Sequence, residues 1–207
     1  MSRSLDYSSI KPKVPIILAS GSESRKQMLS EAGVTFDVIV SSADEASIKN
    51  QISSLPFSDQ VTILAKAKAE PVSIQNPNSI VIGGDQMCVL GSEPLHKPGS
   101  KEKAIASLKT LSNQIHHQHS GVCIFKNNVC LWEYSETVEL KMHNLTKKEI
   151  INYVELENPI NAAGSYKFES LGCNLFEYVD GSSHTVRGMP LLPLLNALRD
   201  LNVISLE

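Results

Sequence analysis

Three carboxylates and three cationic side chains have the types and positions needed to act on a substrate that carries phosphate. Asp44, Glu45 and Asp85 are far apart in the sequence, yet each is expected on a loop or at a strand end beside a candidate binding turn. In proteins, Mg²⁺ is commonly held by one or two carboxylates together with substrate phosphates. The three carboxylates are therefore candidates for a divalent metal site.

Arg25, Lys68 and Lys97 are the cations that would complement such a site. They would oppose phosphate charge, while a metal polarises the attacked phosphorus and a carboxylate orients the water. Lys97 precedes Pro98, which favours an extended backbone and suits a side chain that reaches across a cleft. A single charged residue is more often an exposed surface group, so these six residues have to be judged together.

The first of the elements that would position these residues is a strand, turn and helix. Residues 14–18 are apolar and β-branched, which is typical of a strand buried on both faces. Ser22 can cap the following helix and Gly33 can end it. The turn Ala19-Ser20-Gly21-Ser22 would then direct backbone N–H groups, hydroxyls and Arg25 at one point, as an anion site requires. Locally, an ordinary turn with solvated serines remains an alternative.

The second element is a strand over residues 79–83, followed by Gly84-Asp85-Gln86 and a further apolar run over residues 87–90. Asp85 is therefore expected at a strand end. Two adjacent glycines indicate that a ligand or another segment approaches the backbone closely.

The remaining pattern predicts an α/β fold with a mixed β-sheet and flanking helices. Asn127 and Asn128 favour a hairpin turn, and Thr146 with Glu149 forms a capping box. Further strands are expected over residues 36–40, 121–125, 129–140 and 174–179, and helices after residue 58, over 104–111, after 146 and over 189–201.

Composition narrows the function classes. A net charge of −3 with 20% charged residues gives no bulk attraction to nucleic acid. No apolar run approaches the roughly 20 residues of a membrane span, and residues 1–13 lack an apolar signal core. We expect a cytoplasmic protein that binds neither membranes nor nucleic acid. Four cysteines on apolar or strand-like positions, without paired spacing, are expected to be reduced core thiols: Cys88, Cys123, Cys130 and Cys173.

Other chemistries have weaker support. His116, His117 and His119 could bind Zn²⁺ or Ni²⁺, but without a second ligand set we expect an exposed connection between a helix and a strand. The chain has no Gly-x-Ser-x-Gly motif, and His184 has no partner nucleophile defined by sequence. It also lacks the P-loop and Gly-x-Gly-x-x-Gly motifs of other nucleotide-binding folds.

Taken together, the motifs resemble those of the Maf family, nucleoside triphosphate pyrophosphatases historically described as septum-formation inhibitors. The resemblance covers residues 14–201. Each motif is short, but the order and spacing of the motifs together are more specific than any one of them. The motifs that carry it are Leu18-Ala19-Ser20-Gly21-Ser22 with Arg25, Asp44-Glu45, Leu64-Ala65 with Lys68-Ala69, Gly84-Asp85-Gln86 and Lys97-Pro98.

Residues 1–13 are polar, which predicts a loose N-terminal extension. The resemblance implies one domain over residues 1–207, with two lobes around a deep cleft as in inosine triphosphate pyrophosphatases, and a homodimer. It also implies a metal-dependent reaction, with Mg²⁺ or Mn²⁺, in which water attacks the α-phosphorus of a nucleotide and releases pyrophosphate. Asp85 would accept the proton, and with Glu45 would hold the metal. The expected catalytic residues are Asp85, Glu45 and Lys97, and the expected substrate-binding residues are Ser20, Ser22, Ser24, Arg25, Lys68, Gln86 and Glu169.

Within the family, Gln86 and the run ending at Glu169 resemble the subgroup that acts on 7-methyl-GTP. A carboxylate suits the positively charged ring of 7-methylguanine and accepts hydrogen bonds from its N–H groups. The alternatives are the subgroup that acts on thymidine and uridine triphosphates, and a non-catalytic nucleotide-binding regulator of cell division. Glu23, Ser24 and Arg187 depart from the family pattern, which makes the base preference less secure than the reaction type.

Overall fold

The structure is a computed structural model, and it describes residues 10–206. Its strands are β1 (Ile16–Leu18), β2 (Asp37–Val38), β3 (Ile80–Leu90), β4 (Glu93–Leu95), β5 (Ile115–Lys126), β6 (Val129–Met142) and β7 (Phe176–Asp180). Its α-helices are α1 (Glu23–Glu31), α2 (Glu45–Ile52), α3 (Phe57–Gln75), α4 (Lys101–Leu111), α5 (Lys147–Glu157), α6 (Ser183–Val186) and α7 (Leu191–Asp200). Two 3₁₀ turns, η1 (Ala163–Ser165) and η2 (Leu171–Leu175), precede β7.

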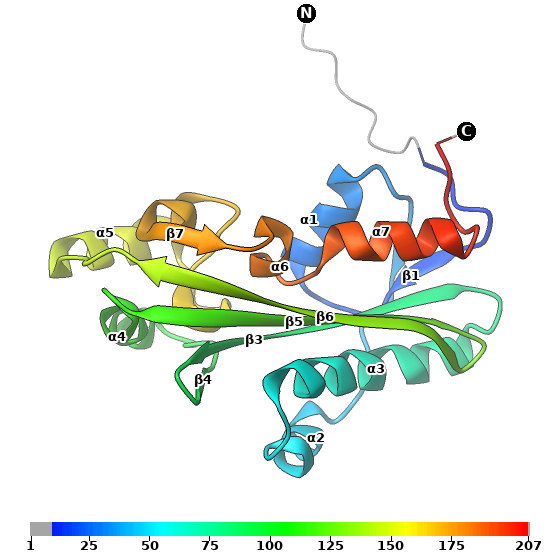
Figure 1. The fold of residues 1–207 in the computed structure, drawn as a ribbon, viewed down its shortest axis with the longest axis horizontal. Helices are drawn as coiled ribbons and strands as arrows, with labels where there is room; N and C mark the ends of the chain where they lie inside the picture. Colours follow the sequence, from blue (N-terminus) through cyan, green and yellow to red (C-terminus); the bar gives the residue numbers. More distant parts are fainter. Residues whose placement is uncertain (1–9, 207) are drawn as a thin grey trace, which may run out of the picture.

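The strands form one mixed sheet in the order β2-β1-β3-β5-β6-β7, with β4 paired to β3 (Figure 1). β1 runs parallel to β2 and β3, whereas β3, β5, β6 and β7 pair antiparallel. The predicted α/β class with a mixed sheet is confirmed. None of the helices within residues 10–206 has the length and apolar character that crossing a bilayer requires.

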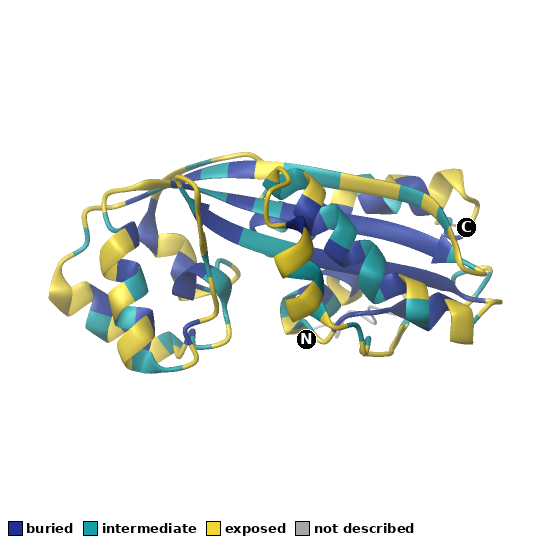
Figure 2. Ribbon diagram, turned by 90° about the horizontal axis from the view of Figure 1, so that it is seen from below, coloured by how far each residue is buried: buried dark blue, intermediate teal, exposed yellow. Residues whose placement is uncertain are grey.

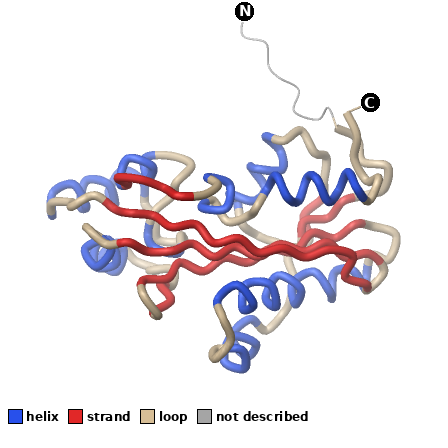
Figure 3. The backbone as a smooth tube through the Cα atoms, in the orientation of Figure 1, coloured by secondary structure: helices blue, strands red, loops and turns tan. Residues whose placement is uncertain are grey.

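Three long strands, β3, β5 and β6, run from one end of the molecule into the other (Figure 3). At one end, α1 and α7 cover one sheet face and α3 covers the other (Figure 1). At the other end, α4 and α5 pack with β6 and β7 around a separate apolar cluster. Figure 2 shows the helices as two groups joined by largely buried strands. The expected two lobes are therefore present, and they share one sheet.

The first strand, turn and helix form as predicted. β1 is buried throughout, and Ser22 caps α1 with its hydroxyl oxygen accepting from the Arg25 backbone N–H. Gly33 lies just beyond the helix with φ 74°, a left-handed conformation that glycine adopts without strain. The hairpin between β5 and β6 has Asn127 and Asn128 at positive φ, and the Thr146 capping box is also present.

Several predicted boundaries are wrong. Asp85 lies in the middle of the continuous strand β3, and Asp44 caps α2 instead of lying on a loop, so Glu45 is in the first turn of that helix. The strand expected over residues 36–40 is reduced to β2. The three histidines lie within β5, where His116 is fully buried, and not in an exposed connection.

The adjacent glycines mark close approaches by two segments, as predicted. A Cβ at Gly83 would lie 2.2 Å from the Ala65 backbone oxygen, so only glycine lets α3 pack directly on β3. A Cβ at Gly84 would lie 3.1 Å from Arg25 Nε. One turn beyond Ala65, Lys68 is consequently held against the middle of β3.

Two further expectations are corrected in part. Cys88 and Cys123 are free buried thiols, but Cys130 is half-buried and Cys173 is exposed, so the last two are not core residues. Residues 1–9 of the expected loose extension lie outside the described residues. Ile10 forms a β-bridge with Val34, and the Lys13 N–H donates to Val203 O. Ile10 and Lys13, both expected in the loose extension, are therefore hydrogen-bonded to the rest of the protein.

Candidate active site

A cleft of about 1450 Å³ opens between the two lobes where β3 has no neighbour on one side. β1 pairs with β3 only as far as Ile82, and β4 begins to pair at Cys88. Within this gap, residues 85–87 of β3 line the cleft. The ten residues expected to be catalytic or to bind substrate line it: Ser20, Ser22, Ser24, Arg25, Glu45, Lys68, Asp85, Gln86, Lys97 and Glu169. Asp44, the third candidate carboxylate for a metal, is not among the lining residues, because it caps α2. The structure thus brings together side chains from segments 149 positions apart, although their roles stay predictions.

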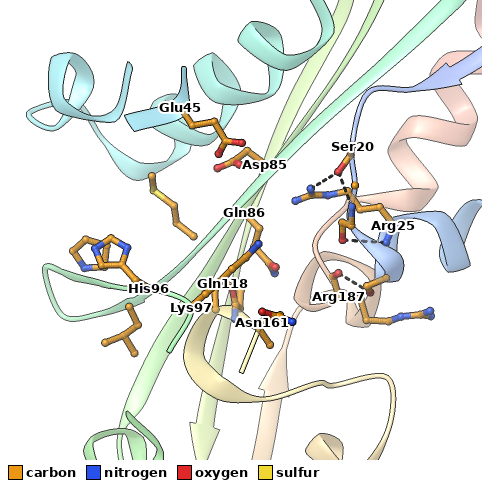
Figure 4. A pocket seen from close by; sticks show the side chains of 18 of the residues that line it. Ser20, Arg25, Glu45, Asp85, Gln86, His96, Lys97, Gln118, Asn161 and Arg187 are labelled. Carbon is orange, nitrogen blue, oxygen red and sulfur yellow. Dashed lines mark hydrogen bonds between the residues drawn. The ribbon is translucent and has the colours of Figure 1, made fainter. Parts of the chain in front are cut away.

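One lysine joins the two principal carboxylates. Lys68 Nζ lies 2.6 Å from Asp85 Oδ1 and 3.1 Å from Glu45 Oε2. The side chains of Lys68 and Asp85 are only 12% and 8% exposed, so their mutual attraction is screened less than that of surface pairs. Figure 4 shows Glu45 and Asp85 directed toward each other at one end of the cleft.

Arg25 lines the wall of the cleft that faces Glu45 and Asp85 (Figure 4). Its Nη1 donates to Ser20 Oγ at 3.0 Å (Figure 4). Its Nε donates to Gly188 O at 2.7 Å. Burial lowers the pKa of the Arg25 guanidinium, and the charges of Asp85 and Glu45 act in the opposite direction. The group remains a fixed cation, as arginine does in proteins.

The serines of the first turn already have structural partners. Ser22 Oγ accepts from the Arg25 backbone N–H at 3.5 Å, and Ser24 Oγ donates to Arg187 O at 2.9 Å. The Arg187 side chain points away to Glu31, with Nη2 3.0 Å from Oε2. Arg187 therefore ties α1 to the segment before α7, in addition to lining the cleft.

The three remaining predicted residues differ in how firmly they are held. The Gln86 amide donates to Thr185 O at 3.2 Å and to Val186 O at 2.8 Å. Lys97 and Glu169 are exposed at the wall formed by the other lobe. These two side chains lie across the cleft from α1, as the extended backbone before Pro98 indicated for Lys97.

Several cleft residues were missed by the sequence reasoning, among them His96, Gln118, Asn161 and Tyr166. Gln118 and Tyr166 are buried and bonded to each other, with Gln118 Nε2 2.7 Å from the Tyr166 hydroxyl. A signal for Gln118 was present, because His116, Gln118 and Ser120 alternate along one strand face. The apolar run that predicts this strand covers only residues 121–125, whereas β5 begins at Ile115.

The carboxylates fit a divalent cation of the Mg²⁺ type. Asp85 Oδ2 is buried and has no hydrogen-bond partner within residues 10–206, which is costly for a charged oxygen unless a ligand satisfies it. Oxygen donors from one or two carboxylates, completed by water and phosphate, are the usual Mg²⁺ set. Within the described residues no group of three or more His, Cys, Asp or Glu could hold a metal by itself, so the substrate would have to complete the shell.

The histidines are not a metal site in this arrangement. His116 lies in the interior, where burial and then the neighbouring His117 lower its pKa to about 4. His117 contacts Glu139 at 3.4 Å, and His119 contacts Thr137 at 2.9 Å. Each ring thus has a different partner.

Comparison with known proteins identifies the family of this chain. The family model described as Maf-like protein matches residues 15–201. A nucleoside triphosphate pyrophosphatase from Legionella pneumophila (strain Corby) is 39% identical over 192 residues, covering 93% of this chain and 96% of that protein. A 7-methyl-GTP pyrophosphatase from Rhizobium johnstonii is 35% identical over 194 residues, covering 92% and 98%. A HAM1 protein structure from Coxiella burnetii aligns with a TM-score of 0.40 and 14% identity, over 64% of this chain and 74% of that one. The chain belongs to the Maf-like protein family.

Proposed function

We propose that this protein hydrolyses a nucleoside triphosphate to the nucleoside monophosphate and pyrophosphate. The observation that carries the proposal is that one cleft contains the ion group of Asp85, Lys68 and Glu45 on one wall and the buried Arg25 on the opposite wall. Such a cleft holds both the cations that bind a polyphosphate and a carboxylate that can take a proton from water. The names of the relatives from Legionella and Rhizobium support the same reaction.

In the proposed reaction, a water oxygen bonds to the α-phosphorus, and the bond from that phosphorus to the oxygen bridging to the β-phosphorus breaks. Pyrophosphate leaves with that oxygen. Asp85 accepts the proton of the attacking water at Oδ2, which is the oxygen not engaged by Lys68. Arg25 and Lys97 oppose the negative charge of the phosphates from the two sides of the cleft.

Glu45 would hold a Mg²⁺ or Mn²⁺ ion beside Asp85, and the ion when bound supplies charge that polarises the phosphoryl oxygens. Lys68 keeps the two carboxylates in register by contacting one oxygen of each. Because Lys68 neutralises part of their charge, it also limits the repulsion between Glu45 and Asp85 before a substrate and metal bind.

We further propose 7-methyl-GTP as the preferred substrate. Glu169 lines the cleft, where its carboxylate can face the positively charged ring of 7-methylguanine. A relative named as a 7-methyl-GTP pyrophosphatase supports this preference. Thymidine and uridine triphosphates are the competing substrates, because members of the same family act on them.

A panel of triphosphates tests both levels of the proposal. Pyrophosphate release is measured with Mg²⁺ and with Mn²⁺ for 7-methyl-GTP, GTP, ATP, CTP, UTP and dTTP. We expect the highest kcat/KM for 7-methyl-GTP. A tenfold or greater preference for UTP or dTTP, about 1.4 kcal/mol in the transition state, would refute the methylguanine preference while keeping the reaction. Tight nucleotide binding without pyrophosphate release under any condition would instead support a regulator.

A further inference from the structure

A buried polar cluster lies in the floor of the cleft, beside the residues assigned to catalysis. His116 Nε2 is 2.9 Å from the Tyr166 hydroxyl, and Gln118 Nε2 donates to the same hydroxyl at 2.7 Å. All three side chains are buried: His116 is 0% exposed, Tyr166 is 4% exposed and Gln118 is 1% exposed. Gln118 and Tyr166 also line the cleft, whereas His116 does not. The cluster therefore extends from the protein interior to the space where a substrate would bind.

The cluster fixes the direction of the Gln118 amide. Since the Tyr166 hydroxyl oxygen accepts from Gln118 Nε2, the hydroxyl proton is available to His116 Nε2. His116 can accept it because burial keeps the ring neutral, with a pKa of about 4. The Tyr166 ring is itself packed edge-on against Phe176, with centroids 4.9 Å apart. The middle member of this short chain of hydrogen bonds is therefore held in place by packing.

The result of this arrangement is a free acceptor. Gln118 Oε1 is buried and has no hydrogen-bond partner among residues 10–206. A buried carbonyl oxygen without a donor destabilises the protein, and a ligand N–H group would remove that cost. The cleft thus contains a fixed oxygen that is suited to a donor on a bound molecule.

The other glutamine of the cleft is differently placed. Gln86 and Gln118 extend into the same region in Figure 4, but both Gln86 contacts run from its amide nitrogen to the backbone oxygens of Thr185 and Val186. A Cβ at Gly188 would lie 3.1 Å from Gln86 Oε1, so that oxygen is directed at the backbone before α7. Gln118, which the sequence reasoning did not identify, is the better placed of the two to contact a base.

We propose that Gln118 is a specificity-determining residue whose side-chain carbonyl accepts a hydrogen bond from a ring or amino N–H of the nucleotide base. Tyr166 and His116 are positioning residues that hold the amide in this orientation. The inference rests on the proposed function, because it takes a nucleotide as the occupant of the cleft. For 7-methylguanine, the donors are N1–H and the exocyclic amino group. Phosphate binding by Arg25 and Lys97 is independent of this contact.

The test separates base recognition from phosphate recognition by calorimetry. Dissociation constants are measured for 7-methyl-GMP and for inorganic pyrophosphate, with the wild-type protein, Gln118→Leu and the control Gln75→Leu, whose side chain is exposed at the end of α3. We expect Gln118→Leu to weaken 7-methyl-GMP binding at least tenfold and pyrophosphate binding less than twofold, with Gln75→Leu unchanged. Equal losses for the two ligands, or no loss for 7-methyl-GMP, would overturn the proposal.

A second arm uses the wild-type protein and so does not depend on how a variant folds. Two analogues that each lack one donor, 7-methyl-IMP and 1,7-dimethyl-GMP, are compared with 7-methyl-GMP. We expect at least one to bind tenfold more weakly, and equal binding of all three would overturn the proposal. If Tyr166 positions the Gln118 amide, Tyr166→Phe should reduce the preference for 7-methyl-GMP over the analogue that binds more weakly to the wild-type protein. The affinity for pyrophosphate should stay unchanged.

Turnover measured on the same samples distinguishes the two proposals. Base-dependent binding that requires Gln118, without release of pyrophosphate from 7-methyl-GTP, would refute the proposed reaction and support the assignment of Gln118. Pyrophosphate release with base preference unaffected by Gln118→Leu would support the reaction and refute the assignment.

Discussion

Lys68 Nζ contacts both carboxylates of the candidate active site, at 2.6 Å from Asp85 Oδ1 and 3.1 Å from Glu45 Oε2. The three residues come from α3, β3 and the first turn of α2, so this ion group joins three separate elements at the edge of the cleft. The arrangement therefore bears on folding stability as well as on chemistry.

Lys68→Met should lower the free energy of unfolding by about 3 kcal/mol, because it leaves the buried Asp85 carboxylate without its cation. Lys66→Met is a matched control on the same helix, where Lys66 pairs with Glu133 at the surface and should contribute less than about 1 kcal/mol. Urea denaturation monitored by circular dichroism measures both. Equal and small losses would show that the Lys68 pair is as weak as a surface pair.

Asp85→Asn should reduce kcat for pyrophosphate release by about 100-fold or more, since an amide of the same shape cannot accept a proton from water. Asp59→Asn, at an exposed position in the first turn of α3, should leave kcat unchanged. Steady-state assays with 7-methyl-GTP measure the effect. Near-normal turnover of Asp85→Asn would remove Asp85 from the role of base.

Chelation of divalent metal should abolish pyrophosphate release, and added Mg²⁺ or Mn²⁺ should restore it. Glu45→Gln should raise the metal concentration needed for half-maximal activity by about tenfold or more, because an amide oxygen is a weaker ligand than a carboxylate. Glu70→Gln, exposed on α3, serves as the control. Full activity in excess chelator would exclude the proposed metal requirement.

The buried His116 should make the protein less stable in acid. Its pKa of about 4 lies below the unfolded value of about 6.5, so the unfolded chain binds more protons between these values. The stability associated with neutral His116 is complete above about pH 6.5 and decreases as the pH falls, by about 3 kcal/mol at pH 4. His116→Gln should reduce this slope, whereas the exposed His143→Gln should not. Urea denaturation between pH 4 and 7 provides the comparison.

Gly83→Ala should lower the free energy of unfolding by about 2 kcal/mol, because the new methyl group would lie 2.2 Å from the Ala65 oxygen and force α3 away from β3. Gly21→Ala is the control, since its methyl group would meet nothing closer than Val40 Cγ2 at 3.5 Å. Thermal unfolding of the two variants tests the prediction. Similar melting temperatures would indicate that the helix shifts at little cost.

Features specified by a few neighbouring residues could be predicted from the sequence. Ser22 and Gly33 mark the ends of α1 because a hydroxyl caps the first turn and a glycine adopts positive φ. Asn127 with Asn128 and the Thr146 capping box act in the same local way. These signals require no knowledge of distant contacts.

Features that depend on distant segments could not be predicted. Asp85 is expected at a strand end because the β-branched run covers only residues 79–83, but pairing of Asp85 with Gly121 and the packing of α3 keep β3 continuous. Tyr166 approaches Gln118 and His116 from 48 and 50 positions away. The convergence of the ten predicted residues in one cleft was inferred from the family resemblance, since no local pattern gives the distance between α1 and the segment around Lys97.

The three strands that extend through both lobes have a consequence for how the protein unfolds. Each lobe obtains its sheet from the same β3, β5 and β6, so neither contains a complete set of strands of its own. Melting of one half would break hydrogen-bond ladders that continue into the other, which favours a single cooperative transition. Substitutions far from the cleft would consequently shorten the lifetime of the assembled cleft along with that of the whole domain.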